Sequence, residues 1–139
     1  MEKESEIQKL LDESAIRDLV RRYAHCVWQK DAAGAAGLFA EDGVMDTGDR
    51  PPLEGKAAIL EEYTQTFDTS IFYPFIHNHV IDVTGQQARG TTYIELRGEV
   101  EGVRMEGYGW YDDQYIQTAA GWKFCRRRLQ LLHYGPIEA

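Results

Sequence analysis

The stretch of sequence that decides the fold is residues 90–116, GTTYIELRGEVEGVRMEGYGWYDDQYI. Two runs rich in β-branched and aromatic residues, 90–100 and 104–116, flank the pair Glu101-Gly102. This pattern predicts a β-hairpin, because only antiparallel strands can be joined by so short a connection. Four glycines would let these strands bend, bulge or turn: Gly98, Gly102, Gly107 and Gly109.

The same strand pattern continues on both sides of the hairpin. Residues 75–83 and 122–134 are also rich in β-branched and aromatic residues, and turn-like residues separate them from the hairpin at 84–86 and 118–121. Four consecutive strands with short connections predict an antiparallel meander.

The N-terminal half of the chain has helical periodicity instead. Apolar residues from Ile7 to Val27 recur at spacings of three and four, which predicts one long helix capped by Ser5. The remaining elements expected here are a short helix over 32–40, a short strand over 43–47, a turn over 48–52 and a helix over 56–67. Helices followed by strands indicate an α+β fold, with a curved sheet that encloses a space against the helices.

The bulk composition indicates one folded domain over residues 1–139. The hydrophobic fraction is 43% and the charged fraction 27%, both ordinary for a globular protein. The formal net charge of −8 argues against a nucleic-acid or anionic-membrane partner, and the basic run Arg126-Arg127-Arg128 is too short to change this. Two cysteines, Cys26 and Cys125, are expected to be reduced.

Several classes of protein are not indicated by the sequence. The charged N-terminus lacks the apolar core of a signal peptide, and no window is apolar enough to cross a bilayer, so we expect a cytoplasmic protein. The sequence has no glycine-rich phosphate loop, cysteine metal cluster or nucleophile elbow. We therefore expect no cofactor and no metal.

Five segments carry a resemblance to a known family: AIRDLVRRYA (15–24), LFAEDGV (38–44), HNHVIDV (77–83), YDDQY (111–115) and GWKF (121–124). In this order they resemble the SnoaL-like proteins of the nuclear transport factor 2-like superfamily. The resemblance implies a cone-shaped, curved antiparallel meander packed on N-terminal helices around one apolar pocket. The superfamily includes scytalone dehydratase, bile-acid dehydratase and polyketide cyclases, and also non-catalytic binding modules, so fold alone does not give function.

The resemblance also identifies positions that carry chemistry in the dehydratase and dehydrochlorinase branches. There a His–Asp pair transfers a proton, with the histidine as base and the aspartate orienting it. The Asp position corresponds to Trp28 and the His position to Pro74, and neither of these residues can transfer a proton. A pocket arginine of the dehydrochlorinase branch corresponds to Arg127.

Four residues are candidates for a catalytic role. Arg127 would stabilise negative charge on a substrate; the alternative is a cross-strand ion pair with Asp113 or Glu95 on a solvated sheet face. Tyr23, Asn78 and Asp113 would handle protons. Their alternatives are a core aromatic for Tyr23, a buried amide satisfying backbone groups for Asn78, and a polar strand-end residue for Asp113. The expected substrate-binding set is Trp28, Met45, Tyr63, Phe67, Pro74, Ile76, Ile94, Leu96, Tyr111 and Leu129.

Strand alternation predicts which residues face outward. His77 and His79 lie two apart, so both should point to the outer face, with Asn78 on the pocket face. Metal binding by the two histidines would need a third ligand, such as His25 or His133. The resemblance implies a homodimer through the outer face, where Tyr93, Tyr108 and Trp110 are expected.

The sequence thus leaves three functions open. The first is a cofactor-free lyase or isomerase, of dehydratase or cyclase type, that acts by proton transfer on a hydrophobic, ring-containing small molecule. The second is a non-catalytic module that binds a small molecule or a partner protein through the same cavity. The third is a structural oligomer without a cavity of ligand size.

Overall fold

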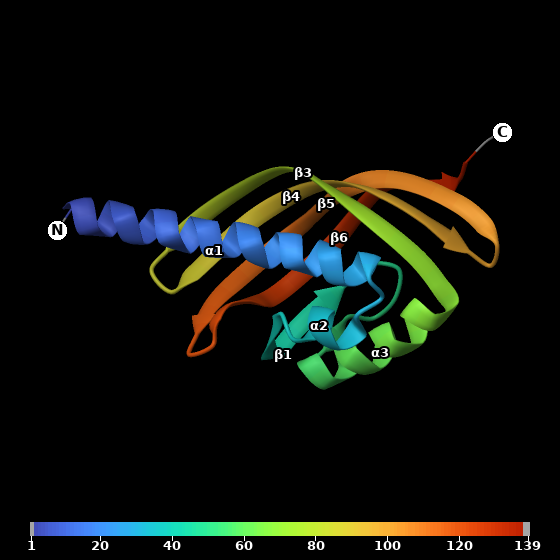
Figure 1. The fold of residues 1–139 in the computed structure, drawn as a ribbon, viewed down its shortest axis with the longest axis horizontal. Helices are drawn as coiled ribbons and strands as arrows, with labels where there is room; N and C mark the ends of the chain where they lie inside the picture. Colours follow the sequence, from blue (N-terminus) through green and yellow to red (C-terminus); the bar gives the residue numbers. More distant parts are fainter. Residues whose placement is uncertain (1, 138–139) are drawn as a thin grey trace.

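The computed structural model describes residues 2–137 and has an α+β architecture (Figure 1). The helices are α1 (Glu2–Trp28), α2 (Ala32–Ala36) and α3 (Lys56–Thr69). The strands are β1 (Phe39–Asp46), β2 (Leu53–Glu54), β3 (Ser70–Thr84), β4 (Gln87–Val100), β5 (Val103–Thr118) and β6 (Gly121–Pro136). All six strands belong to one curved, open sheet in the order β2-β1-β6-β5-β4-β3.

The predicted meander forms the greater part of this sheet. Strands β3 to β6 pair antiparallel with their neighbours along the chain, and each is longer than the sequence pattern indicated. The turn between β4 and β5 is the predicted pair Glu101-Gly102, with φ of 51° and 81°. Two successive positive φ values are typical of a type I′ hairpin turn, whose twist matches that of the strands.

The other edge of the sheet was not predicted in detail. Strand β1 pairs parallel with β6, with Val44 opposite Arg126, and the two-residue β2 pairs with β1. A parallel partner so distant along the chain cannot be read from the apolar pattern of a short strand.

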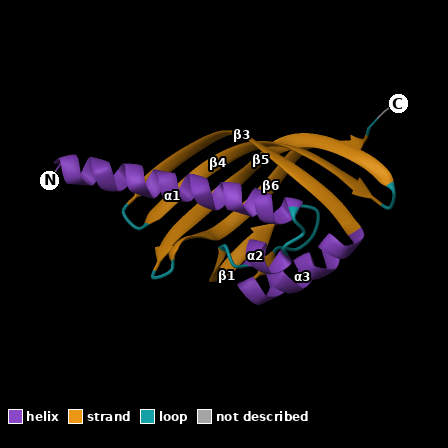
Figure 2. Cartoon of the chain, in the orientation of Figure 1, coloured by secondary structure: helices purple, strands orange, loops and turns teal. Residues whose placement is uncertain are grey.

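The helices lie on the concave side of the sheet (Figures 1 and 2). The inward face of α1 is buried from Ile16 to Val27, as its periodicity predicts. The first turns of α1 extend past the sheet, so Ile7 and Leu10 are exposed, contrary to the predicted stripe. At this end the buried side chain is Asp12, which accepts a hydrogen bond from Trp122 Nε1 at 3.1 Å.

Three β-bulges interrupt the antiparallel register of the meander. They lie between Ile76 and His79 in β3, opposite Tyr108/Gly109 in β6, and opposite Gln114/Tyr115 in β6. Each bulge inserts one residue and so exchanges the inward and outward faces of the strand beyond it. Gly109 has no room for a side chain here, because a Cβ atom would lie 2.0 Å from the carbonyl oxygen of Gln130.

Two further observations concern the chain as a whole. Cys26 and Cys125 are free thiols. None of the helices within residues 2–137 is long and apolar enough to cross a membrane.

Candidate functional site

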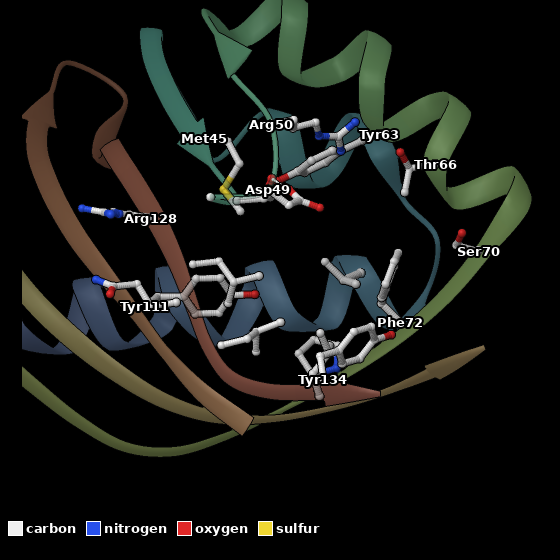
Figure 3. Close-up of a pocket in the computed structure, with 18 of the residues that line it drawn as sticks. Met45, Asp49, Arg50, Tyr63, Thr66, Ser70, Phe72, Tyr111, Arg128 and Tyr134 are labelled. Carbon is white, nitrogen blue, oxygen red and sulfur yellow. Dashed lines mark hydrogen bonds between the residues drawn. The ribbon is translucent and has the colours of Figure 1, made fainter. Parts of the chain in front are cut away.

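A cavity of about 730 Å³ lies between α1, α3, the loop between β1 and β2, and the concave face of the sheet (Figure 3). This volume falls within the range of small-molecule pockets. Its apolar lining consists of Val27, Met45, Phe67, Phe72, Pro74, Leu96, Val100, Leu129 and Leu131. Its polar lining consists of Tyr23, Thr47, Asp49, Arg50, Tyr63, Thr66, Ser70, Tyr111, Arg128, Gln130 and Tyr134.

Two tyrosine hydroxyls from different helices meet at the wall of this cavity. Tyr23 on α1 and Tyr63 on α3 share a hydrogen bond at 2.6 Å. The pair has two hydroxyl hydrogens and uses one in this bond, so one remains for a ligand oxygen. Burial raises the pKa of both phenols, which keeps them protonated as hydrogen-bond donors.

A third tyrosine, Tyr111 on β5, reaches the cavity from the sheet (Figure 3). Only 5% of this residue is exposed, and its hydroxyl forms no hydrogen bond with any group in residues 2–137. The hydroxyl nevertheless retains access to the cavity, since it is not among the sealed polar atoms. Burial raises the pKa of Tyr111, while the nearby charge of Arg127 opposes this rise.

The Arg127 guanidinium lies behind these rings. Its carbon atom is 3.5 Å from the centroid of the Tyr111 ring, 4.4 Å from that of Tyr23 and 4.5 Å from that of Phe124. These distances are short for cation–π contacts, and the side chain has no exposed surface. Arg127 is therefore interior but does not itself line the cavity.

Asp113 neutralises this buried cation. Arg127 donates from Nε to Oδ1 at 3.0 Å and from Nη2 to Oδ2 at 3.3 Å. Burial alone would lower the pKa of Arg127, but Asp113 and the surrounding tyrosines outweigh this, so the pKa lies above its ordinary value. The alternative expectation of a cross-strand pair with Asp113 is thus confirmed, although the pair lies in the interior rather than on a solvated face.

A chain of hydrogen bonds continues from Asp113 across β4 and β5 to His79 on β3. Tyr115 and Thr92 donate to Oδ2 of Asp113, at 2.9 and 3.3 Å, so every polar contact of this carboxylate is with a donor. Burial raises the pKa of Asp113, against the lowering effect of Arg127 and these hydrogen bonds. These hydrogen bonds from donors favour the ionised form.

His79 forms the end of this chain. Its Nε2 lies 3.1 Å from the Tyr115 hydroxyl, whose only hydrogen is donated to Asp113. His79 must therefore donate from Nε2, which assigns the Nε2–H tautomer to the neutral ring. Burial lowers the pKa of His79 to about 4, and the positive charges of Arg127, Arg17 and Arg21 act in the same direction.

The structure brings most of the predicted lining together at the cavity. Eight expected residues lie on its wall: Tyr23, Met45, Tyr63, Phe67, Pro74, Leu96, Tyr111 and Leu129. Ile94 is buried in the core and Ile76 packs against that core, and neither lines the cavity.

The β3 bulge overturns the expected orientations of Asn78 and His79. Ile76 faces inward opposite Ile94, and His79 faces inward opposite Thr92, so both residues between them, His77 and Asn78, lie outside. Asn78 is exposed rather than in or beside the cavity. His77 faces outward as expected and pairs with Glu95 at 3.0 Å, so the two histidines lie on opposite faces and cannot share a metal ion.

Trp28 also lies outside the cavity that it was expected to line. Its indole is 40% exposed and stacks on Tyr73 at 4.4 Å, next to Phe75. The indole N–H donates to the carbonyl oxygen of Pro74 at 2.8 Å. Trp28 and Pro74, the positions that the resemblance relates to the His–Asp pair, are thus in direct contact.

Sequence reasoning missed the loop between β1 and β2. The sequence predicts only a turn here, but Thr47, Gly48, Asp49 and Arg50 line the cavity mouth. Arg50 forms an ion pair with Glu62 on α3, and Thr47 donates to Asp49 at 2.6 Å. The signal in the sequence was the pair of charged residues Asp49 and Arg50 in the predicted turn between a strand and a helix. Only the fold shows that these side chains face the cavity.

Comparison with known proteins places the chain in a family. The sequence profile described as a SnoaL-like domain matches residues 8–128. The chain belongs to this SnoaL-like family and has the nuclear transport factor 2-like fold. No match was found among curated proteins.

Solved structures support the same fold. A Novosphingobium aromaticivorans protein provisionally named an aromatic ring hydroxylase is 27% identical, with TM-score 0.85 over 92% of this chain and 94% of that one. A second protein from this organism, provisionally named a scytalone dehydratase, is 20% identical, with TM-score 0.84 over 94% and 91%. The hexachlorocyclohexane dehydrochlorinase LinA-type3 of Novosphingobium barchaimii is 15% identical, with TM-score 0.86 over 95% and 94%.

Proposed function

We propose that this chain binds a hydrophobic, ring-containing small molecule in the cavity and acts on it by proton transfer without a cofactor, as a lyase or isomerase. The observation that carries the proposal is a cavity of about 730 Å³ whose mainly apolar wall meets three tyrosine hydroxyls. Apolar walls suit a ring, and a few convergent polar groups fix its orientation. Two of the similar structures have names that refer to ring compounds, an aromatic ring hydroxylase and a hexachlorocyclohexane dehydrochlorinase.

The tyrosines suit a carbonyl or hydroxyl oxygen on such a ring. Their pKa values are raised, so Tyr23, Tyr63 and Tyr111 act as donors and not as bases. Donors aimed at an oxygen that gains negative charge lower the energy of an enolate-like transition state.

The base in this proposal is Asp49. Its carboxylate lies at the mouth of the cavity, on the same side as Tyr63 (Figure 3). Asp49 would take the proton from a carbon next to the carbonyl, and the electron pair of that C–H bond would move to the oxygen held by the tyrosines. Return of the proton to another carbon gives an isomerase. In a dehydratase the enolate would re-form the carbonyl, the C–O bond of a hydroxyl on the next carbon would break, and that hydroxyl would leave as water with the proton held by Asp49.

Binding without catalysis is the second candidate. It is favoured by the contact between Trp28 and Pro74, because neither residue can transfer a proton where the resemblance expects the His–Asp pair. Such a module would use the same cavity to hold or sense its ligand.

Deuterium exchange separates the two candidates. The protein is incubated with 2-tetralone in D₂O, and incorporation next to the carbonyl is followed by mass spectrometry. We expect exchange above the buffer rate, reduced about 10²-fold in Asp49→Asn, the lower range for losing a general base. Asp68→Asn, an exposed carboxylate on α3, is the matched control.

Native mass spectrometry of protein purified from its source completes the experiment. A retained small molecule without any catalysed exchange would support the binding module. If the purified protein retains no small molecule and binds no ring probe, both candidates are refuted.

A further inference from the structure

The polar groups at the cavity indicate the charge of the ligand as well as its shape. Tyr111 is the group that the protein leaves unused, since its hydroxyl has no hydrogen-bond partner within residues 2–137 although 95% of the residue is buried. A hydroxyl that reaches a cavity and has no partner in the protein keeps its hydrogen free for a ligand. The hydroxyl faces the cavity, so this partner would be a ligand oxygen.

The Arg127 guanidinium lies directly behind the Tyr111 ring. Asp113 occupies the Nε and Nη2 edge of Arg127, while Nη1 has no partner among the described residues. The planar cation lies 3.5 Å from the Tyr111 ring centroid and 4.4 Å from that of Tyr23. Asp113 offsets part of this charge, but at Tyr111 the effect of Arg127 is the larger of the two, and in an interior of low dielectric constant it extends to an oxygen held by the hydroxyl.

Two further tyrosine hydroxyls at the cavity wall offer one more donor. The Tyr23–Tyr63 pair has one free hydroxyl hydrogen, and the carboxylate of Asp113 is saturated by its own donors on the other side of Arg127. The free hydroxyl hydrogens of these tyrosines would thus donate to a ligand oxygen, while the carboxylate of Asp49 lies at the cavity mouth.

We propose that the cavity preferentially binds the ionised form of an acidic phenol or enol, with the oxyanion on the Tyr111 hydroxyl and the Arg127 guanidinium behind the ring. This inference rests on the proposed function, because it specifies the ligand class of the same cavity. It does not depend on whether the ligand reacts: a binding module would select the same oxyanion.

Phenols whose spectra report their ionisation test this inference. The probes are 4-nitrophenol, read by absorbance, and 2-naphthol, read by fluorescence, each titrated with pH in the presence of saturating protein. We expect the bound pKa to lie about one unit below the free value, equivalent to about tenfold tighter binding of the anion.

The variant Tyr111→Phe isolates the hydroxyl. It keeps the ring over Arg127 and removes a group that has no partner inside the protein, so the denaturation midpoint should not fall. We expect it to abolish most of the shift in bound pKa, whereas Tyr108→Phe, an exposed tyrosine on the outer face, should leave the shift unchanged.

Each outcome has a definite meaning. Binding with a bound pKa equal to or above the free value would overturn the inference and leave the proposed function standing. An unchanged shift in Tyr111→Phe would also overturn it, because the oxyanion would then lie elsewhere. Failure of both probes to bind in either form would refute the proposed function and the inference together.

Discussion

The buried ion pair between Asp113 and Arg127 allows the sharpest prediction about stability. Both side chains are completely buried, and Asp113 accepts four hydrogen bonds, from Arg127, Tyr115 and Thr92. Asp113→Leu would leave the guanidinium charged and unpaired in the interior, which costs about 3–5 kcal/mol of unfolding free energy. A domain of this size has a total of about 5–15 kcal/mol, so the variant should be close to unfolding.

A double-mutant cycle tests this argument. The variants Asp113→Leu, Arg127→Met and their combination are unfolded with urea and followed by circular dichroism. An apolar pair of similar volume replaces the ion pair in the double variant, so it should be more stable than the sum of the single effects predicts, by at least about 2 kcal/mol. Asp112→Ala, an exposed neighbour, should change stability by less than about 1 kcal/mol.

The result that would refute the reasoning is additivity. If the double variant loses as much as the two single variants together, the two groups do not compensate each other's charge. A loss below about 1 kcal/mol in Asp113→Leu would likewise show that Arg127 finds water or another partner.

Three further predictions concern pH, the outer face and a glycine. The pKa of His79 falls from 6.5 to about 4 on folding, so as pH falls the unfolded chain takes up this proton before the folded chain does. The folded state should therefore lose stability as pH falls from 6.5 to about 4. The loss should be roughly 1–2 kcal/mol, a value reduced because the side chain is partly exposed. When the midpoint of urea unfolding is measured against pH, this loss of stability should be absent in His79→Gln and present in His77→Gln. We propose, as the resemblance implies, that the exposed aromatic outer face forms a homodimer; Tyr108→Glu should then shift sedimentation toward monomer, and a wild-type monomer at micromolar concentration would contradict this. Gly109→Ala should destabilise by about 1–3 kcal/mol in thermal unfolding, because its Cβ would meet the Gln130 carbonyl, and a neutral effect would show that the bulge yields.

The meander could be read from the sequence because its signals are local. Turn residues such as Glu101-Gly102 and alternating β-branched and aromatic residues determine both the strands and their antiparallel pairing. The parallel partner of β1 could not be read, since it lies some eighty residues away and depends on how the helices close the sheet.

Side-chain orientation was predictable only up to the first bulge. Alternation places Pro74 inward correctly, but the extra residue after Ile76 turns Asn78 outward and His79 inward. A bulge of this kind cannot be recognised from the apolar pattern, because each of the two faces of β3 carries both polar and apolar side chains. The chain of hydrogen bonds from Asp113 to His79 could not be predicted either, since it depends on the bulge that turns His79 inward.

The charge distribution suggests how a ligand would be selected on entry and after binding. The protein has a net charge of −8, so an anion in solution is repelled at long range, while a neutral phenol or ketone approaches freely. Inside the cavity a ligand oxygen meets the hydroxyls of Tyr111 and Tyr23, and the guanidinium behind Tyr111 is only partly offset there by Asp113. A molecule that enters neutral and gains negative charge on its oxygen there is therefore stabilised more in its charged form than in its entering form. This difference is what proton-transfer catalysis requires, because only interactions that strengthen toward the transition state accelerate a reaction.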